Sequence, residues 1–256
     1  MKKLIVVSVV LTAVGMLFLG VNSVIVSARS AICESNFKRV IVGLWSYENS
    51  YKCFPPAKQD KHSWRIRSFL ECTAMQDGFR YRFAEPWNSS FNMKLFPGVP
   101  SVYSCSQNNE LSGTNTNVFM LVGEHAFGSE NGYRQKKDIV DGLDTTLGIV
   151  ESLMPSHWLE PRDLDVSNMS FKINDVVYPS ISSHSRVGPV VCFVDGAIFR
   201  ISPETPESIV KSLVLMDDGE KLDRQKLIKD RILFSLNGEL SLPISSQDIR
   251  EEPSVR

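Results

Sequence analysis

Four histidines are the side chains best suited to acid and base chemistry in this sequence: His62, His125, His157 and His184. None stands in H-E-x-x-H or near a cysteine at ligand spacing, and no G-x-S-x-G, Walker loop or G-x-G-x-x-G occurs. The sharpest pair is His184 with Asp195, which a hairpin could bring together as acid and base. Alternatively, Asp195 and Gly196 form a turn and His184 packs or caps beside it. We favour this structural role, and expect no enzyme, no cofactor and no metal.

Three aspartates at close spacing, Asp138, Asp141 and Asp144, offer the hard oxygen ligands that calcium prefers. They lack the D-x-D-x-D-G pattern of a calcium loop. Asp141 is followed by Gly142, and an Asp-Gly pair is typical of a turn. A turn is therefore the favoured interpretation of Asp141 and Gly142, and a calcium site is the alternative.

Aromatic residues are frequent between residues 57 and 117 and after them. The rings that could line a carbohydrate groove are Trp64, Trp87, Trp158, Tyr81 and Tyr103. Such rings more often pack in a core or half-buried layer. Packing is the favoured interpretation, and a groove for a glycan or peptide is the alternative.

The N-terminus carries Lys2 and Lys3 and then no charged side chain before Arg29. As a helix, Leu4 to Ala28 would reach roughly 37 Å, enough to cross a hydrocarbon core of about 30 Å. A removable signal ending at Val26-Ser27-Ala28 is the alternative, but the run is long for one. The two lysines favour a cytoplasmic N-terminus and place the domain on the extracytoplasmic side. The net charge of -1 argues against nucleic-acid binding.

Helical spacing of apolar residues follows this run from Cys33 to about Ser50, so we expect the helix to continue until Phe54-Pro55-Pro56 stops it. A second helix is expected over Ser63 to Met75. Apolar, partly β-branched segments predict strands at 118–122 and 145–153.

The C-terminal third contains the clearest local pattern, two apolar segments at 190–194 and 197–201 joined by Asp195-Gly196. It predicts a hairpin with a two-residue type I′ turn. Thr205 is expected to cap a helix that runs to Met216. A further amphipathic helix is expected within 221–236, and disorder over 245–256.

These segments, in order, resemble a prepilin-like secreted family, domain of unknown function 1559. The similar blocks are Cys33 to Val40, Phe54-Pro55-Pro56, Ser63-Trp64-Arg65, Tyr81 to Ser89, Pro100 to Cys105, Ile139 to Gly142, and His184 with Phe193 to Gly196. The resemblance covers about residues 30 to 220. Two features depart from the family pattern. The family's G-F-T-L-V-E opening is absent, and ten residues instead of nine separate His184 from Asp195.

The resemblance implies a disulfide between Cys33 and Cys105, the positions that match the family's two cysteines. Cys53 with Cys72 is a weaker second pair, and Cys192, inside an apolar strand, is expected to be a free buried thiol. An odd count of five cysteines leaves at least one unpaired.

The fold expected from the residues and the resemblance is α+β, with a long N-terminal helix packed on a small antiparallel sheet as in pseudopilins. The expected division is a membrane anchor or signal at 1–28, an extracytoplasmic domain at 29–220 and a charged tail at 221–256. The function implied is that of a non-enzymatic, membrane-anchored component of a surface or secretion assembly, with protein partners there. The alternative is an anchored binding module for a glycan, a peptide or a calcium ion.

Overall fold

The computed structural model describes residues 28–72, 81–95, 97–105, 113–130 and 132–236. Its centre is a six-stranded sheet in the order β5-β3-β4-β6-β7-β8. The strands are β3 (Val118–Val122), β4 (Leu147–Glu151), β5 (Leu164–Asp165), β6 (Val190–Phe193), β7 (Ile198–Ile201) and β8 (Leu233–Phe234). All pairs are antiparallel except β3 with β5. The α+β class is therefore confirmed, but the sheet is mixed where a purely antiparallel one was expected.

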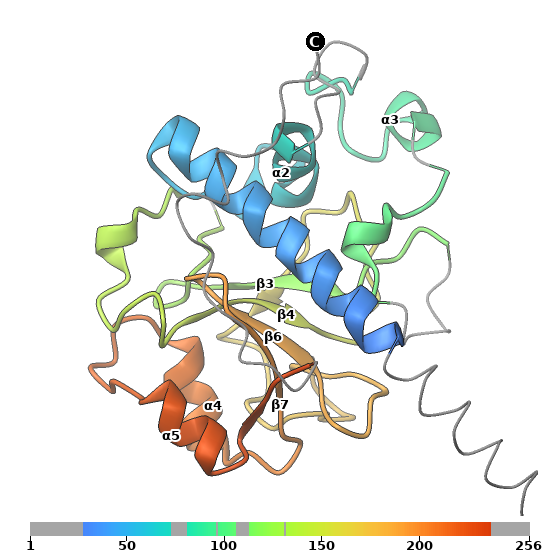
Figure 1. The fold of residues 1–256 in the computed structure, drawn as a ribbon. Helices are drawn as coiled ribbons and strands as arrows, with labels where there is room; N and C mark the ends of the chain where they lie inside the picture. Colours follow the sequence, from blue (N-terminus) through green and yellow to red (C-terminus); the bar gives the residue numbers. More distant parts are fainter. Residues whose placement is uncertain (1–27, 73–80, 96, 106–112, 131, 237–256) are drawn as a thin grey trace, which may run out of the picture.

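A long helix over residues 28–51 crosses one face of the sheet (Figure 1). Its buried side packs with alternate residues of the strands in one apolar cluster. The helix contributes Cys33, Phe37, Val40, Ile41 and Leu44, each at most 2% exposed, and β3 contributes Val118, Met120 and Val122. Side chains return to the same face every 3.6 residues in a helix and every 2 residues in a strand. This explains why residues at these spacings meet in one cluster. The helix continues to residue 51, close to the predicted end.

The opposite face of the sheet is covered by α4 (Glu207–Val214) and α5 (Arg224–Lys229) (Figure 1). The intervening residues of the same strands, such as Phe119, Val191 and Phe199, form a second cluster with Val210 and Leu213 of α4. Helices on both faces explain why the central strands are apolar throughout, since neither face meets solvent.

Short elements surround this core. They are β1 (Lys58–Gln59), β2 (His62–Ser63), α2 (Trp64–Cys72), α3 (Ser90–Leu95), the 3₁₀ turns η2 (Ser101–Tyr103) and η3 (Lys136–Asp138). The helix predicted at Ser63 to Met75 is α2. Its last three predicted residues lie outside the described ones.

Three local predictions at the C-terminal end differ from the structure. Thr205 does not cap α4, because its hydroxyl donates to the carbonyl of Ser202 at 2.7 Å and α4 begins two residues later. The helix predicted within 221–236 is limited to α5, which Asp223 caps through the amides of Gln225 and Lys226. The chain then forms β8 beside β7, so this part of the expected tail belongs to the sheet.

Within the described residues, no helix combines the length and the hydropathy needed to cross a membrane. The predicted anchor or signal, Leu4 to Ala28, lies outside the described residues except for its last position, as does the predicted disorder at 245–256.

A buried carboxylate closes the end of β4. Glu151 is 1% exposed and accepts hydrogen bonds from the Val190 amide at 3.0 Å and the Asn117 side-chain amide at 3.3 Å. Burial raises its pKa from 4.5 to about 7. The positive charge of Arg200, which is also buried, favours the ionised form of Glu151 and offsets only part of this rise.

This carboxylate makes stability depend on pH. Because the folded protein keeps the Glu151 proton at pH values where the unfolded chain has lost it, the free energy of unfolding should fall as the pH rises from about 4.5 to about 7. A shift of this size corresponds to on the order of 3 kcal/mol. Urea unfolding at pH 5 and pH 8 measures the difference, and Glu151→Gln should remove most of it. An equal difference in the variant would contradict the assignment.

Candidate functional site

Two of the Asp-Gly turns, at Asp141-Gly142 and at Asp195-Gly196, lie side by side at one end of the sheet. We call residues 141–146 together with 194–197 the turn cluster. The Asp195 amide donates to the carbonyl of Leu143 at 2.9 Å, and the Val194 amide donates to the carbonyl of Thr146 at 2.9 Å. The loop before β4 is thereby fixed to the loop after β6. The sequence predicted both turns but not that they contact each other.

Both glycines of the turn cluster have the positive φ that a turn needs, 113° at Gly142 and 95° at Gly196. The hairpin turn is not the predicted type I′, because Asp195 does not have a positive φ. The Gly196 amide donates to the carbonyl of Phe193, and the Phe193 amide donates to the carbonyl of Ala197. This is the three-residue connection in which a turn is followed by a glycine bulge.

Two carboxylates of the turn cluster, those of Asp141 and Asp195, are engaged in backbone and ion-pair contacts. Asp141 accepts from the amides of Asp218 at 2.9 Å and Gly219 at 3.1 Å, which ties the loop after α4 to the cluster. Asp195 accepts from the Ala197 amide at 3.0 Å. Its other oxygen forms an ion pair with Arg224 at 2.6 Å. These contacts support the predicted structural role of Asp141 and Asp195.

Arg224 joins the two halves of the turn cluster. Besides binding Asp195, its Nε donates to the carbonyl of Asp144 at 3.0 Å, and its guanidinium lies 4.5 Å from the centre of the Phe193 ring. Sequence reasoning missed this residue because it placed Arg224 in a charged tail. Nothing in the sequence around Arg224, which begins a polar helix, indicates that it pairs with Asp195, 29 residues earlier.

His184 and Asp195 do not form the acid and base pair that the sequence allowed. His184 precedes β6 and Asp195 follows it, so the two lie toward opposite ends of that strand. His184 is exposed and lines a hollow with Met154 and residues 174–180.

The calcium alternative has no support from the geometry. Asp138 accepts from the Gln135 amide at 2.8 Å in a capping box, and both oxygens of Asp141 are engaged as described above. Among the described residues, no group of three histidine, cysteine, aspartate or glutamate side chains is placed to hold a metal ion.

The N-terminal helix is connected to the turn cluster by Trp45. Its indole Nε1 donates to the carbonyl of Val194 at 3.0 Å. Lys136 lies over the same ring at 4.1 Å and forms an ion pair with Glu48 at 2.7 Å. The turn cluster therefore positions the helix on the sheet.

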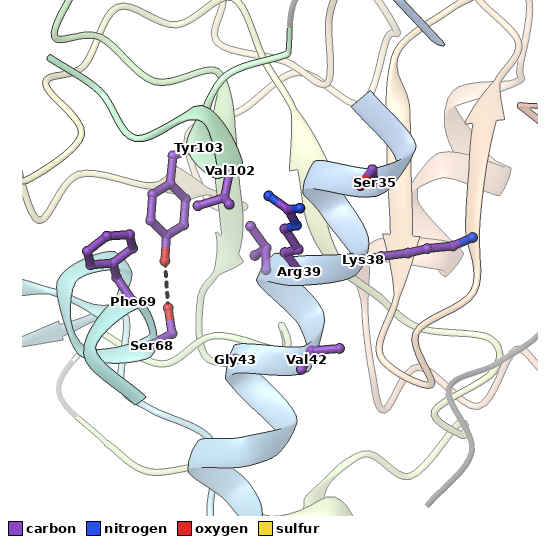
Figure 2. Close-up of a pocket in the computed structure, with 10 residues that line it drawn as sticks. Ser35, Lys38, Arg39, Val42, Gly43, Ser68, Phe69, Val102 and Tyr103 are labelled. Carbon is purple, nitrogen blue, oxygen red and sulfur yellow. Dashed lines mark hydrogen bonds between the residues drawn. The ribbon is translucent and has the colours of Figure 1, made fainter. Parts of the chain in front are cut away.

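On its other side the N-terminal helix borders a groove of about 430 Å³ toward α2 and η2 (Figure 2). One wall is Phe69, Val102 and Tyr103, whose phenol is 2.9 Å from the Ser68 hydroxyl. The helix side presents Arg39, with Gly43 below it, whereas the Lys38 ammonium points away from Tyr103 and forms an ion pair with Glu34 at 2.7 Å. The hydroxyl of Tyr103 also donates to the carbonyl of Arg65 at 2.8 Å, and this hydrogen bond joins η2 to α2.

The aromatic rings proposed for a groove are mostly core. Trp64 and Trp158 are fully buried and Tyr103 is 2% exposed. Tyr103 stacks on Trp158 with centroids 5.8 Å apart. Tyr81 is buried too, and Trp87 is half-buried beside His157. The packing interpretation is therefore confirmed for these rings.

The disulfide between Cys33 and Cys105 is present, with Cα atoms 4.9 Å apart. Cys192 is a free buried thiol as predicted, and burial raises its pKa. Cys53 is also free, so the predicted pair with Cys72 is wrong. Cys53 follows the end of the helix at residue 51, and no pattern in the sequence fixed its partner.

Comparisons with known proteins agree with the resemblance in the sequence. Neither the curated proteins nor the solved structures contain a match to this chain. Residues 27–180 match the profile of the family described as "Protein of unknown function (DUF1559)", which is more than half of the chain. The chain thus belongs to the domain of unknown function 1559 family.

Proposed function

We propose that this protein is a non-enzymatic, membrane-anchored component of an extracytoplasmic assembly, built in the manner of a pseudopilin. Its apolar N-terminal segment holds it in the membrane, and the helix that follows carries the folded domain. Its partners are other proteins of a surface or secretion system. No nucleic acid is involved.

The observation that carries this proposal is the fixed attachment of the helix at residues 28–51. Its buried side packs on the sheet, Trp45 bonds to the turn cluster, and Cys33 is covalently joined to Cys105. The helix follows directly on the uncharged run that ends at Ala28. A rigid joint at this place would hold the domain at a defined position relative to a membrane, whereas a flexible linker would not.

Three further features support the proposal. A disulfide favours an oxidising compartment, in agreement with an extracytoplasmic domain. The polar groups of the turn cluster are engaged in holding loops together. The groove of Figure 2 offers apolar walls suited to a protein contact.

The anchor is tested by fractionating cells that express the full chain with its native N-terminus. We expect the protein to stay with the membranes through washes in high salt and carbonate and to be released only by detergent. A variant with Leu17→Glu and Phe18→Lys should be lost from the membranes, because each charge costs about 2.5 to 3.5 kcal/mol at the centre of a spanning helix. The matched control, Leu17→Ile with Phe18→Leu, should behave as the wild type.

Mass spectrometry of the same membranes gives the mature N-terminus. An intact N-terminal region supports a retained anchor, and external protease should digest the domain in spheroplasts. Release by carbonate, or cleavage after Ala28, would instead make the protein a free secreted domain and refute the anchor.

A further inference from the structure

A second cavity, of about 510 Å³, lies between the end of the N-terminal helix, β1 and the second half of α2. It is separate from the groove of Figure 2 and from the turn cluster. Its described lining comprises Tyr47, Tyr51, Cys53, Gln59, Arg67, Leu70, Glu71, Phe83 and Tyr133. We call it the tyrosine pocket. Its volume is within the range of pockets that hold small ligands.

Four aromatic rings line the tyrosine pocket, and three of them remain substantially open to solvent. Tyr51 is 56%, Tyr133 53% and Phe83 41% exposed. Tyr47 is buried beside Tyr51, with ring centroids 4.4 Å apart. Large rings that stay exposed around one cavity provide flat apolar faces for a ligand.

Two polar groups of the tyrosine pocket are buried without a hydrogen-bond partner, Gln59 Oε1 and Arg67 Nε. The Arg67 guanidinium lies 4.8 Å from the centre of the Phe83 ring, and it forms no ion pair within the described part of the chain. Leaving such groups unpaired costs about 1 to 3 kcal/mol each. Both atoms are shielded from solvent, so a ligand reaches them when the Gln59 and Arg67 side chains turn toward the cavity, where they provide an acceptor and donors.

The charges of the tyrosine pocket cancel. Glu71, one turn along α2 from Arg67, accepts a hydrogen bond from the Tyr51 hydroxyl at 3.2 Å. Because Arg67 and Glu71 carry opposite charges, the pocket has no net electrostatic preference for an anion or a cation. A purely apolar ligand would leave Gln59 and Arg67 unpaired. The lining therefore favours a neutral ligand with apolar faces and many hydroxyl groups.

We propose that the tyrosine pocket binds a neutral sugar unit of a glycan. The C–H face of a sugar ring suits the faces of the tyrosines and Phe83, while its hydroxyls donate to Gln59 and accept from Arg67. This proposal does not depend on the membrane anchor, since it concerns the folded domain.

The experiment uses the full chain in detergent and three probes, cellobiose, maltose and di-N-acetylchitobiose, with benzoate and tetramethylammonium as charged comparisons. Saturation-transfer NMR and calorimetry should detect at least one sugar with a Kd of roughly 1 mM or tighter, and neither ion. Tyr51→Ala should weaken that binding at least tenfold. Tyr178→Ala, at a ring 63% exposed outside the pocket, is the matched control and should leave it unchanged.

Cys53 provides a second readout, because its thiol lies in the pocket lining and is only partly buried. Burial and Glu48 raise its pKa, so alkylation by iodoacetamide is measured at pH 9 by peptide mass spectrometry. The sugar that binds should slow alkylation of Cys53. Cys192 is fully buried and should stay unmodified, which shows that the protein remains folded during the reaction. Failure of all three sugars to bind would overturn the proposal. Undiminished binding to Tyr51→Ala, or alkylation of Cys53 that saturating sugar leaves unchanged, would also overturn it.

Discussion

Replacing Asp163 by Ala should lower the free energy of unfolding by about 3 to 5 kcal/mol, because it leaves a buried arginine without its counter-charge. Arg65 is fully buried, and its Nη2 is 2.6 Å from Asp163, whose side chain is 3% exposed. The same carboxylate accepts from the Met120 amide at 2.8 Å and from the Trp64 indole at 3.1 Å. The pair therefore joins α2 to strand β3 of the six-stranded sheet. Urea unfolding of the wild type and the variant measures the loss.

The neighbouring pair Arg162 and Glu160 supplies the control. Its atoms are 3.0 Å apart, but the Arg162 side chain is 55% exposed, so Arg162→Ala should cost less than about 1 kcal/mol. Combining Arg65→Met with Asp163→Leu should recover a large part of the stability lost by Asp163→Ala, since both charges are then removed. A loss below about 1 kcal/mol for Asp163→Ala would contradict this account of the pair.

Replacing Cys33 and Cys105 by Ser should have an effect of similar size. The bond joins residues 72 apart in sequence, and closing a loop of that length stabilises the fold by about 4 kcal/mol in the chain-entropy description. We expect the variant to unfold at a lower urea concentration, and the wild type to shift to the same value when reduced. Cys53→Ser is the control, because Cys53 is free. Equal stability of the oxidised and reduced wild type would refute the prediction.

The sequence predicted the elements that repeat a pattern over enough residues. The helix at 28–51 and the strands β3, β4, β6 and β7 were recognised because apolar spacing and bounding turns persist along them. The disulfide came from the family resemblance, not from spacing. Two-residue strands such as β5 and β8 are too short to show any period, so the mixed sheet and its last strand were not predicted.

The site was less predictable than the fold. Asp141, Gly142, Asp195 and Gly196 were correctly interpreted as turn residues, because Asp-Gly is a local signal. The contact between their turns, and the part of Arg224 in it, depend on tertiary packing that leaves no local trace. The tyrosine pocket could not be predicted for the same reason, because its rings come from distant parts of the sequence, residues 47–51, 83 and 133.

The covalent bond at Cys33 also determines how the molecule would respond to mechanical load. Tension applied at residue 28 passes through the helix for only a few residues before it reaches Cys33, and from there it crosses directly to Cys105. The chain beyond Cys105 leads to strand β3 of the six-stranded sheet. Residues 34–104 are bypassed and cannot be stretched while the bond is intact. The groove of Figure 2 and most of the tyrosine pocket are built from this bypassed segment, so their segments would be protected from extension during pulling on the N-terminus.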